Sequence, residues 1–253
     1  MKALEFTRSG LVASLAVFLV AAACVRLGVW QLDRRDQRLE RNAAISERLD
    51  DDPAALTTPP LDTVGLTHRQ ATVHGSYDAA RTLVLGGRSH AGSPGVHVYA
   101  PLRIGDGAIL VNRGWIPSMD AASIDLSRVE VDTAVTVRGV LMPLPKTGAA
   151  GPDDGGFRTT WFRLDADAVR SQYPYPISPL YLQANAPDTD STRRTRAGPR
   201  EVPIPVPPQS LDAGPHLSYA VQWFSFAVIA VIGWGTLAMR AGRNGGRSSG
   251  TSA

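Results

Sequence analysis

Two stretches of the chain are almost purely apolar, and they lie near its opposite ends. Leu11–Val25 contains no charged residue, and Leu217–Met239 contains none over 23 residues. Because a helix rises about 1.5 Å per residue, about 20 apolar residues are enough to cross the hydrocarbon of a bilayer. The pattern predicts two transmembrane helices, at 11–32 and 216–239, and it excludes a soluble cytosolic enzyme.

Between these spans the hydrophobic pattern changes its period twice. From Gln31 to Asp52 neither Gly nor Pro occurs, and the charged and apolar residues follow helical spacing, so the first helix is expected to continue to about residue 52. Beyond Pro53, apolar residues alternate with polar ones at the period of a strand. The strands expected from this alternation are His68–Gly75, Thr82–Leu85, Val96–Ile104, Ala108–Trp115, Val131–Met142, Phe157–Leu164 and Ile177–Ala184, with a short helix at Asp165–Gln172.

The predicted fold class is therefore a membrane protein, with two transmembrane α-helices flanking a β-rich α+β domain outside the cytoplasm. The domain occupies residues 53–185, and 186–215 form a linker with seven prolines. Short tails at 1–10 and 240–253 complete the chain. Leu144–Gly148 matches the LPxTG sorting pentapeptide, but about 68 residues separate it from the second span. We therefore interpret it as a loop of the domain.

The distribution of charge gives the expected topology. The formal charge is +3, yet residues 31–215 hold 20 basic and 22 acidic residues, so the positive excess lies in and beside the spans and indicates no nucleic-acid partner. No Lys or Arg occurs between Glu201 and Met239, and three Arg follow in the C-terminal tail. By the positive-inside rule both termini are expected in the cytoplasm and the domain outside it, in a cell membrane protein with two spans.

Candidate chemistry in the domain is sparse. The only cysteine, Cys24, lies in the first apolar stretch, which excludes disulfides and thiolate metal sites from the domain. Small residues before Cys24 resemble a lipoprotein cleavage site, but the apolar character resumes beyond it, which favours an uncleaved helix. The chain has no P-loop, no HExxH and no glycine-rich dinucleotide turn. Four histidines occur in the predicted domain without ligand spacing: His68, His74, His90 and His97.

His216 differs from these because it lies at the outer edge of the second span. Tyr219 and Trp223 follow at i+3 and i+7, so the imidazole is expected beside aromatic rings at the bilayer boundary. Such an imidazole can serve as the axial ligand of a lipid-soluble macrocycle. Residue chemistry alone also allows a second interpretation, an interfacial histidine in an aromatic belt.

Several motifs together resemble the Surfeit locus protein one family. They run in the family's order from Leu27–Arg34 (LGVWQLDR) and His68–Tyr77 through Gly95–Leu102 and Leu110–Pro117 (LVNRGWIP) to His216–Phe224 (HLSYAVQWF). Matching blocks extend from about residue 20 to 235, and the NRGW and HLxYAxQW elements are specific in combination. Within NRGW, Gly114 is expected to meet a steric requirement and Trp115 to join the core, and the role of Arg113 stays open.

The resemblance implies a non-enzymatic assembly factor of haem–copper cytochrome c oxidase. Its partners would be the catalytic subunit of the oxidase, the lipid bilayer and haem a synthase, and its role would be a chaperone-like assistance of haem a insertion in the respiratory chain. The family's membrane histidine maps onto His216, the expected axial ligand of a transiently bound haem a. Tyr219 and Trp223 would shield the macrocycle, and Trp30, Gln31 and Arg34 would close the site or meet a propionate. Residue chemistry alone also allows Trp30 and Arg34 to serve as interfacial anchors.

Two alternatives compete with this function. A membrane scaffold would stabilise the catalytic subunit without holding haem, and it predicts that His216→Ala leaves oxidase assembly intact. An extracytoplasmic enzyme would use scattered His and Asp residues, and it predicts activity or metal content in the domain alone. No motif in the sequence supports this last alternative.

Overall fold

The computed structural model describes residues 8–129, 134–148, 156–185, 203–207 and 210–245. Contacts divide the chain into two compact units. One, here called the helix pair, comprises the chain up to Ala44 together with the chain from Leu211 onward. The other, the barrel domain, comprises Ile45–Ser210. The predicted fold class is confirmed, since two apolar helices flank a β-rich domain. The tails at 1–7 and 246–253 lie outside the described residues.

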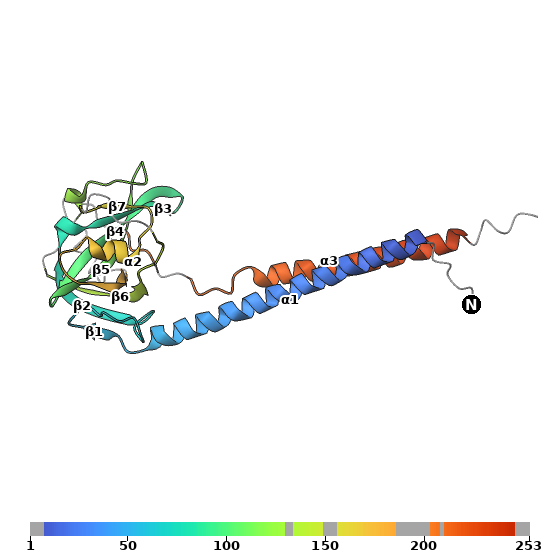
Figure 1. Cartoon of the computed structure of the whole chain (residues 1–253), viewed down its shortest axis with the longest axis horizontal. Helices are drawn as coiled ribbons and strands as arrows, with labels where there is room; N and C mark the ends of the chain where they lie inside the picture. Colours follow the sequence, from blue (N-terminus) through green and yellow to red (C-terminus); the bar gives the residue numbers. More distant parts are fainter. Residues whose placement is uncertain (1–7, 130–133, 149–155, 186–202, 208–209, 246–253) are drawn as a thin grey trace, which may run out of the picture. The chain divides into compact units, whose positions relative to one another are not determined.

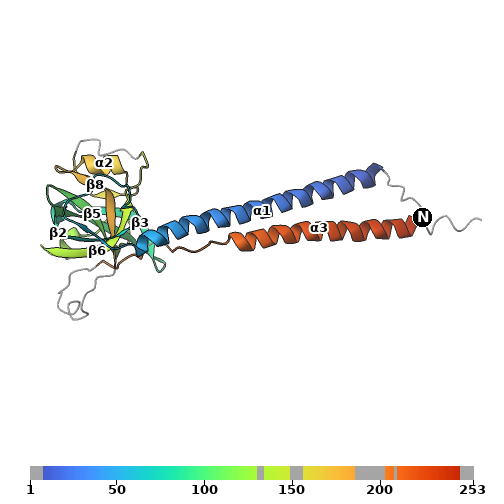
Figure 2. The same ribbon diagram turned by 90° about the horizontal axis from the view of Figure 1, so that it is seen from below.

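The helix pair is formed by α3 (His216–Gly245) and by the part of α1 (Arg8–Asp50) up to Ala44. The two helices run antiparallel (Figures 1 and 2). Small residues form the seam between them: Ala21, Cys24 and Ala227 are buried together. Near one end of the seam the indole Nε1 of Trp234 donates to Ser14 Oγ at 3.1 Å. Large apolar side chains face outward instead, as with Phe18 at 69% and Ile229 at 64% exposure. Both helices are long and apolar enough to cross a membrane.

The barrel domain contains eight strands and three short helices among the described residues. The strands are β1 (Ala54–Leu56), β2 (Gln70–Tyr77), β3 (Leu83–His90), β4 (Ser93–Ile104), β5 (Gly107–Pro117), β6 (Val135–Pro143), β7 (Thr160–Trp161) and β8 (Ile177–Ala184). The helices are the 3₁₀ turns η1 (Ala79–Arg81) and η2 (Leu126–Arg128) and the α-helix α2 (Ala166–Ser171).

The sheet closes on itself through its longest strand. Its order is β1-β2-β6-β8-β5-β4-β3-β7, and β2 also pairs with β4. The first half of β4 pairs with β3, and the second half turns to β2 through Leu102 and Arg103. The circuit β2-β6-β8-β5-β4 is therefore a five-stranded barrel, and closure removes the open edges that a flat sheet of this kind would expose.

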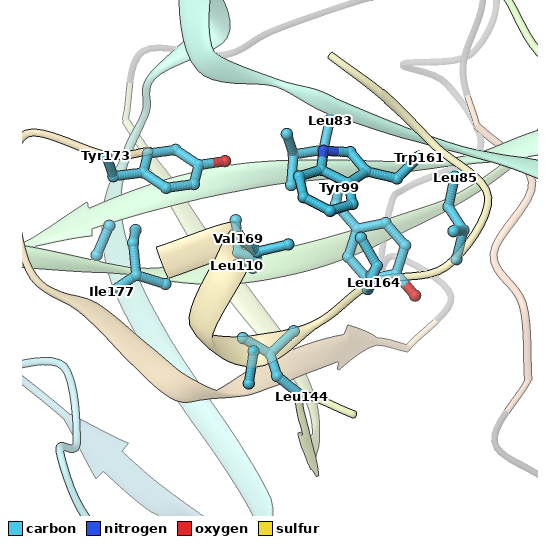
Figure 3. Packing of buried hydrophobic residues seen from close by; sticks show 12 residues of the cluster. Leu83, Leu85, Tyr99, Leu110, Leu144, Trp161, Leu164, Val169, Tyr173 and Ile177 are labelled. Atoms are coloured by element: carbon cyan, nitrogen blue, oxygen red, sulfur yellow. The ribbon is translucent and has the colours of Figure 1, made fainter. Parts of the chain in front are cut away.

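Three clusters of buried side chains fill the described part of the barrel domain, and the smallest of them contains Val84, Val96 and Ile116. The first packs Leu83, Leu110 and Ile177 of the sheet under Val169 of α2 and against Trp161 (Figure 3). The second fills the barrel interior with Val73, Leu102, Ile109, Leu141 and Leu182. Each of these five side chains is fully buried. Burial of such side chains contributes about 1.5–3 kcal/mol each, so the clusters are the main source of the domain's stability.

Most of the predicted strands are present, and the exceptions have local causes. The strand expected at 82–85 was predicted to end at Gly86-Gly87, but β3 continues to His90 because the glycines form a bulge between Leu85 and Arg88. A side chain at Gly86 would collide with the carbonyl of Ala121 and the ring of Phe162. The alternation of apolar and polar residues therefore stops at Gly86, although the strand itself continues.

Other boundaries also differ from the prediction. The strand expected at 157–164 shrinks to Thr160–Trp161, since the chain turns there toward the Asp165 cap of α2. The three-residue strand β1 was missed because it is too short to show a period. The helix expected at 165–172 is confirmed as α2 with Asp165 and Gln172 as its caps. The start of the strand expected at 131–142 lies partly outside the described residues.

The described part of the expected linker, 186–215, is not all free chain. Backbone hydrogen bonds join Ile204 and Trp115 in both directions, at 2.7 and 2.8 Å. Gln183 Nε2 also donates to the carbonyl of Val206 at 2.8 Å. These contacts attach the segment to β5 and β8. Residues 186–202 and 208–209 of this segment lie outside the described residues, as do 149–155 of the small-residue loop at 148–156.

The LPxTG-like segment is a loop of the domain, as predicted. Leu144 is buried in the first core cluster. The backbone N–H groups of Thr147 and Gly148 donate to Asp165 Oδ2 at 2.7 and 2.8 Å. The other oxygen of Asp165 caps α2. These donors lower the pKa of Asp165, with the helix-capping and loop N–H groups as the main causes.

Candidate functional site at the start of the second apolar helix

The predicted ligand His216 is the first residue of α3 and lies in the seam of the helix pair. It is half-buried, and its Nδ1 lies 2.9 Å from Oε1 of Gln31 on α1. The amide oxygen of Gln31 can only accept a hydrogen bond, so the imidazole Nδ1 carries the proton. In the neutral form of the ring with this tautomer, Nε2 carries the free lone pair. The structure therefore brings together two residues that the sequence separates by 185 positions.

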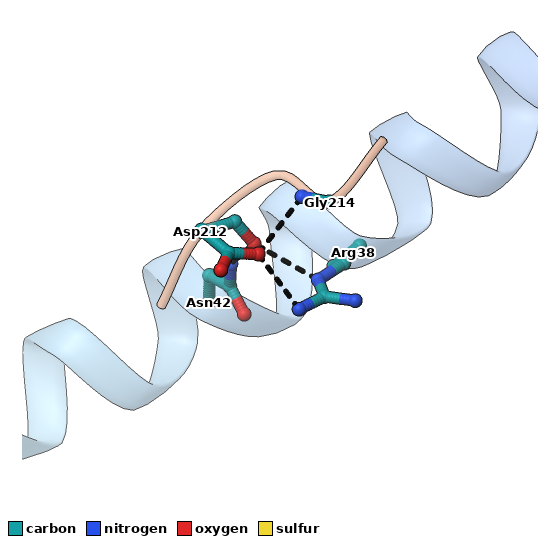
Figure 4. A network of polar contacts seen from close by, with 4 residues as sticks. All are labelled: Arg38, Asn42, Asp212 and Gly214. Carbon is teal, nitrogen blue, oxygen red and sulfur yellow. Dashed lines mark hydrogen bonds and ion pairs between the residues drawn. The ribbon is translucent and has the colours of Figure 1, made fainter. Parts of the chain in front are cut away.

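A polar network holds the segment that leads into His216. Arg38 of α1 donates from Nε to the carbonyl oxygen of Asp212 at 2.9 Å and from Nη2 to its carboxylate at 2.8 Å (Figure 4). Asn42 Nδ2 donates to the same carbonyl at 2.9 Å, and the N–H of Gly214 donates to the Asp212 carboxylate at 2.9 Å. The network fixes where the segment approaches α1, a few residues before the histidine.

Two glycines make this geometry possible. Gly214 has φ of +68°, a left-handed conformation that favours glycine, and the Arg38 guanidinium lies 3.1 Å from where a Cβ would be. Gly28 lies on α1 against the ring of Phe224, and a Cβ there would come within 2.6 Å of the ring. The sequence motif containing Gly28 therefore has a steric role, which its interpretation as a site element missed.

The remaining predicted site residues occupy different faces of the helix pair. Trp30 and Tyr219 are exposed, at 43% and 49%. The Arg34 guanidinium lies 5.6 Å from the centre of the Trp30 ring. Trp223 is half-buried and packs against the cluster around Cys24. The structure thus pairs His216 with Gln31, and it places Tyr219 on the outer surface of α3, away from the buried seam that Ala220 occupies.

The NRGW motif has a structural explanation. Register shifts between Val98 and Tyr99 leave Arg113 opposite no residue of β4, so it is the extra residue of a bulge inside β5. Asn112 Oδ1 spans the bulge by accepting from the N–H of Gly114 at 3.1 Å. Gly114 has φ of +130°, and a Cβ there would lie 2.2 Å from the carbonyl oxygen of Ile204. The steric role of Gly114 and the burial of Trp115 are confirmed, although the motif lies within a strand and forms no turn. The Arg113 guanidinium lies over the ring of Tyr77, 4.9 Å from its centre.

His90 and His97 interact electrostatically, whereas His68 and His74 have other partners. His74 Nδ1 is 3.0 Å from Thr136 Oγ1 across strands β2 and β6. His68 is in a left-handed turn conformation, and burial together with the charge of Arg48 lowers its pKa. His97 is half-buried on β4, between β3 and β5. Throughout the described ranges, no three His, Cys, Asp or Glu side chains converge as a metal-binding group.

Comparison with known proteins identifies the family. The SURF1 family model matches residues 18–228, which is most of the chain. The chain belongs to the SURF1 family. It is 26% identical to a SURF1-like protein of Monosiga brevicollis over 91% of this chain and 89% of that protein. It is 24% identical to a SURF1-like protein of Rickettsia felis over 87% of this chain and 93% of that protein. Surfeit locus protein 1 of Rattus norvegicus is 22% identical over 86% of this chain and 73% of its own length.

The SURF1 match includes both contacting partners of the seam. Gln31 and His216 each lie inside the matched residues, and so do Gly28 and Phe224, which pack against each other. In this chain the two terminal motifs, which are separate in the sequence, are therefore the two halves of one contact in the helix pair.

Proposed function

We propose that this protein is a membrane-anchored, non-enzymatic assembly factor of haem–copper cytochrome c oxidase that assists haem a insertion, with His216 as a transient axial ligand. Membership of the SURF1 family supports the coarser role in oxidase assembly. The observation that carries the finer role is the hydrogen bond from His216 Nδ1 to Gln31 Oε1. A second group on Nδ1 is the usual way in which proteins orient a histidine that ligates a metal through Nε2.

The residues present fit a haem site of this kind. His216 has an imidazole that can ligate a metal in its neutral form, and it lies at the start of the apolar helix α3, beside α1. The exposed ring of Tyr219 offers an aromatic surface about one turn away. When bound, haem would supply an iron that the imidazole of His216 could ligate. Gln31 orients the ring, and the Arg38–Asp212 contact fixes the segment before it. Arg34, which is exposed beside Trp30, supplies a cation suited to a propionate.

The proposed topology places both termini in the cytoplasm and the barrel domain outside it. Two apolar helices that are long enough to cross a bilayer support two membrane spans. The Arg residues of the C-terminal tail support a cytoplasmic C-terminus, by the positive-inside rule. In this arrangement His216 lies at the outer boundary of the bilayer. The expected partners are the catalytic subunit of the oxidase, haem a synthase as the source of the cofactor, and the surrounding lipid.

The test is purification of the full chain in detergent from cells that make haem a, followed by its visible spectrum and extraction of the haem. We expect bound haem a in the wild type, loss in His216→Ala, and partial loss with an altered spectrum in Gln31→Leu, because the ring is no longer oriented. His74→Ala, which removes a histidine of the barrel domain, is the matched control and keeps the wild-type spectrum.

A colourless wild type from haem-replete cells would contradict the haem-binding role. If oxidase assembly in those cells still requires the chain and tolerates His216→Ala, the scaffold function is the better account. In that case the exposed apolar faces of α1 and α3 would serve as anchors and contact surfaces for the oxidase.

A further inference from the structure

Gly95 on β4 brings together two side chains from its neighbouring strands. Arg88 of β3 is the direct pairing partner of Gly95. The indole of Trp115, from β5, lies on the other side, and a Cβ at Gly95 would fall 2.4 Å from its Nε1. Because Gly95 has no side chain, the indole edge rests on the strand backbone beside Arg88. The bulge in β3 and the bulge in β5 both lie next to this point.

Both side chains keep a buried donor without an acceptor. Trp115 is only 5% exposed, and its Nε1–H has no hydrogen-bond partner among the described residues. Arg88 Nε is buried and likewise has none in this part of the chain. Leaving a buried donor unpaired is unfavourable by about 1–3 kcal/mol, more for a charged group, and native proteins rarely tolerate it without a reason. Two such donors, which come from β3 and β5 and meet over Gly95 of the intervening strand β4, call for a shared acceptor.

The charge of Arg88 also lacks a counter-ion. In the part of the chain that the structure describes, the ion pairs are Arg35–Asp36, Arg38–Asp212 and Arg81–Asp78, and none includes Arg88. Its titratable neighbours do not supply a negative charge. Burial, followed by the charges of Arg88 and His90, lowers the pKa of His97 to about 4, so this ring is neutral at pH 7.

Two tyrosines face the same guanidinium and stay protonated. Burial raises the pKa of Tyr99 and of Tyr181 far enough that both hydroxyls keep their protons at neutral pH. Tyr99 accepts from Asn112 Nδ2 at 3.3 Å and is hydrogen-bonded to Tyr181. The surroundings of Arg88 therefore offer N–H and O–H donors around one positive charge.

We propose that Arg88 and Trp115 form a binding site for a carboxylate group, here called the Arg88–Trp115 site. A carboxylate carries one negative charge and accepts planar, forked hydrogen bonds from a guanidinium, while its second oxygen accepts from the indole N–H. A phosphate is less suited, since its higher charge faces a single cation. The proposal does not depend on haem binding by the helix pair.

His90 packs beside the indole of this site. Its ring lies 5.3 Å from the ring of Trp115, tilted by 39°. His90 is half-buried at the end of β3, next to a turn in which Ala91 and Gly92 have φ of 48° and 81°. The ligand reaches the indole N–H by displacing this ring, which is more exposed than the indole beneath it. The carboxylate has two sources: a small carboxylic acid, or an acidic side chain of a partner polypeptide.

The test follows the indole N–H signal of Trp115 by ¹⁵N NMR of the full chain in detergent micelles, assigned with Trp115→Phe. Acetate and N-acetyl-glutamic acid amide are titrated at constant ionic strength, with chloride and inorganic phosphate as reference anions. We expect a saturable downfield shift of this one signal with carboxylates. Tighter binding of the blocked glutamate than of acetate would identify a polypeptide side chain as the source, and the reverse would identify a small acid.

Variants establish whether the response comes from this site. Arg88→Gln should weaken the carboxylate response roughly tenfold or more, since it removes a charged donor. Arg163→Gln, which removes an exposed arginine of the same domain, should leave it unchanged, and the other four indole signals report that each variant is folded. The same shift with chloride, tighter binding of phosphate, no shift at all, or an undiminished response in Arg88→Gln would each overturn the proposal.

Discussion

The helix pair and the barrel domain distribute their apolar side chains in opposite ways. The barrel domain buries its large residues, as with Leu110 and Leu182 at 0% exposure. The helix pair buries Ala21, Cys24 and Ala227 and exposes large residues such as Ile229. Large residues inside indicate a unit that folds against water, and small residues inside indicate helices that associate within an apolar medium. One chain thus carries two packing rules, each matched to a different solvent.

The largest difference between the two units should appear when one large apolar side chain is deleted in each. Leu110→Ala removes a fully buried residue of the barrel domain and should destabilise it by about 2–5 kcal/mol. Ile229→Ala removes a residue that is 64% exposed on α3 and should leave the unfolding transition within about 0.5 kcal/mol of the wild type. Denaturant unfolding of the full chain in detergent measures both. Equal losses would show that the two units pack by the same rule.

The reverse experiment enlarges a small residue of the seam. Gly28→Leu places a side chain where a Cβ alone would approach Phe224 to 2.6 Å, so α1 and α3 should separate locally, at a cost of about 1–3 kcal/mol. Ala227→Cys supplies a partner for the native Cys24, which lies in the same buried cluster, and the yield of this disulfide on oxidation reports the contact.

The expected result is a several-fold lower disulfide yield in Gly28→Leu than in the parent with Ala227→Cys. Gly233→Leu is the matched control, because a Cβ there meets nothing within 4 Å, and its yield should equal that of the parent. A reduced yield in the control would mean that a large side chain anywhere on these helices disturbs the pair. The claim that close packing is confined to the seam would then be wrong.

Acid should affect the barrel domain through His97. The pKa of this histidine is about 4 in the folded state, because of burial and then the charges of Arg88 and His90, against about 6.5 in an unfolded chain. The unfolded state therefore binds more protons between these values, and stability falls as the pH drops from about 6.5 to 4. We expect a loss of about 1–2 kcal/mol, below the full linkage value because the ring is partly solvated. His97→Gln should weaken the dependence of the unfolding midpoint on pH between about 4 and 6.5. The same dependence in this variant and in the wild type would contradict the role of His97.

The smallest effect is expected at the far end of the seam. Ser14→Ala removes the acceptor of the Trp234 indole, and hydrogen bonds between membrane helices contribute about 0.6 kcal/mol on average. In the Ala227→Cys background, the yield of the disulfide between Cys24 and the introduced cysteine should fall by less than in Gly28→Leu. A larger fall than in Gly28→Leu would show that polar contacts, more than close packing, hold the pair together.

The sequence predicts the two units well, because each has a strong periodic signal. The run of uncharged residues identifies both apolar helices, and alternation identifies strands such as Val96–Ile104. The alternation does not reveal closure of the barrel. Closure depends on β4, whose first half pairs with β3 and whose second half pairs with β2. Gly86-Gly87 was misread as a strand end because glycines in turns and in bulges look alike along a chain.

The site was predicted in part for a similar reason. The motif containing Gln31 and the motif containing His216 are both visible in the sequence, but only packing of α1 against α3 reveals that these two side chains touch. Arg38, Asn42 and Asp212 gave no signal, since single polar residues in a charged helix and a Pro-rich segment are common. The proposed site at Arg88 and Trp115 was missed because these residues lie on two different strands and come together only over Gly95 of the strand between them.

The distance along the chain between the two halves of the seam has a consequence for biosynthesis. Gln31 and His216 are 185 positions apart, with the whole barrel domain between them. At about 5–20 residues per second, a ribosome that has made α1 needs roughly 10 to 40 s before α3 emerges. During this interval Ser14 and Gln31 cannot form their hydrogen bonds with Trp234 and His216, because α3 has not yet been made. The newly made chain thus has a period in which α1 is open to other helices, and its correct pairing depends on the second helix arriving before a competitor does.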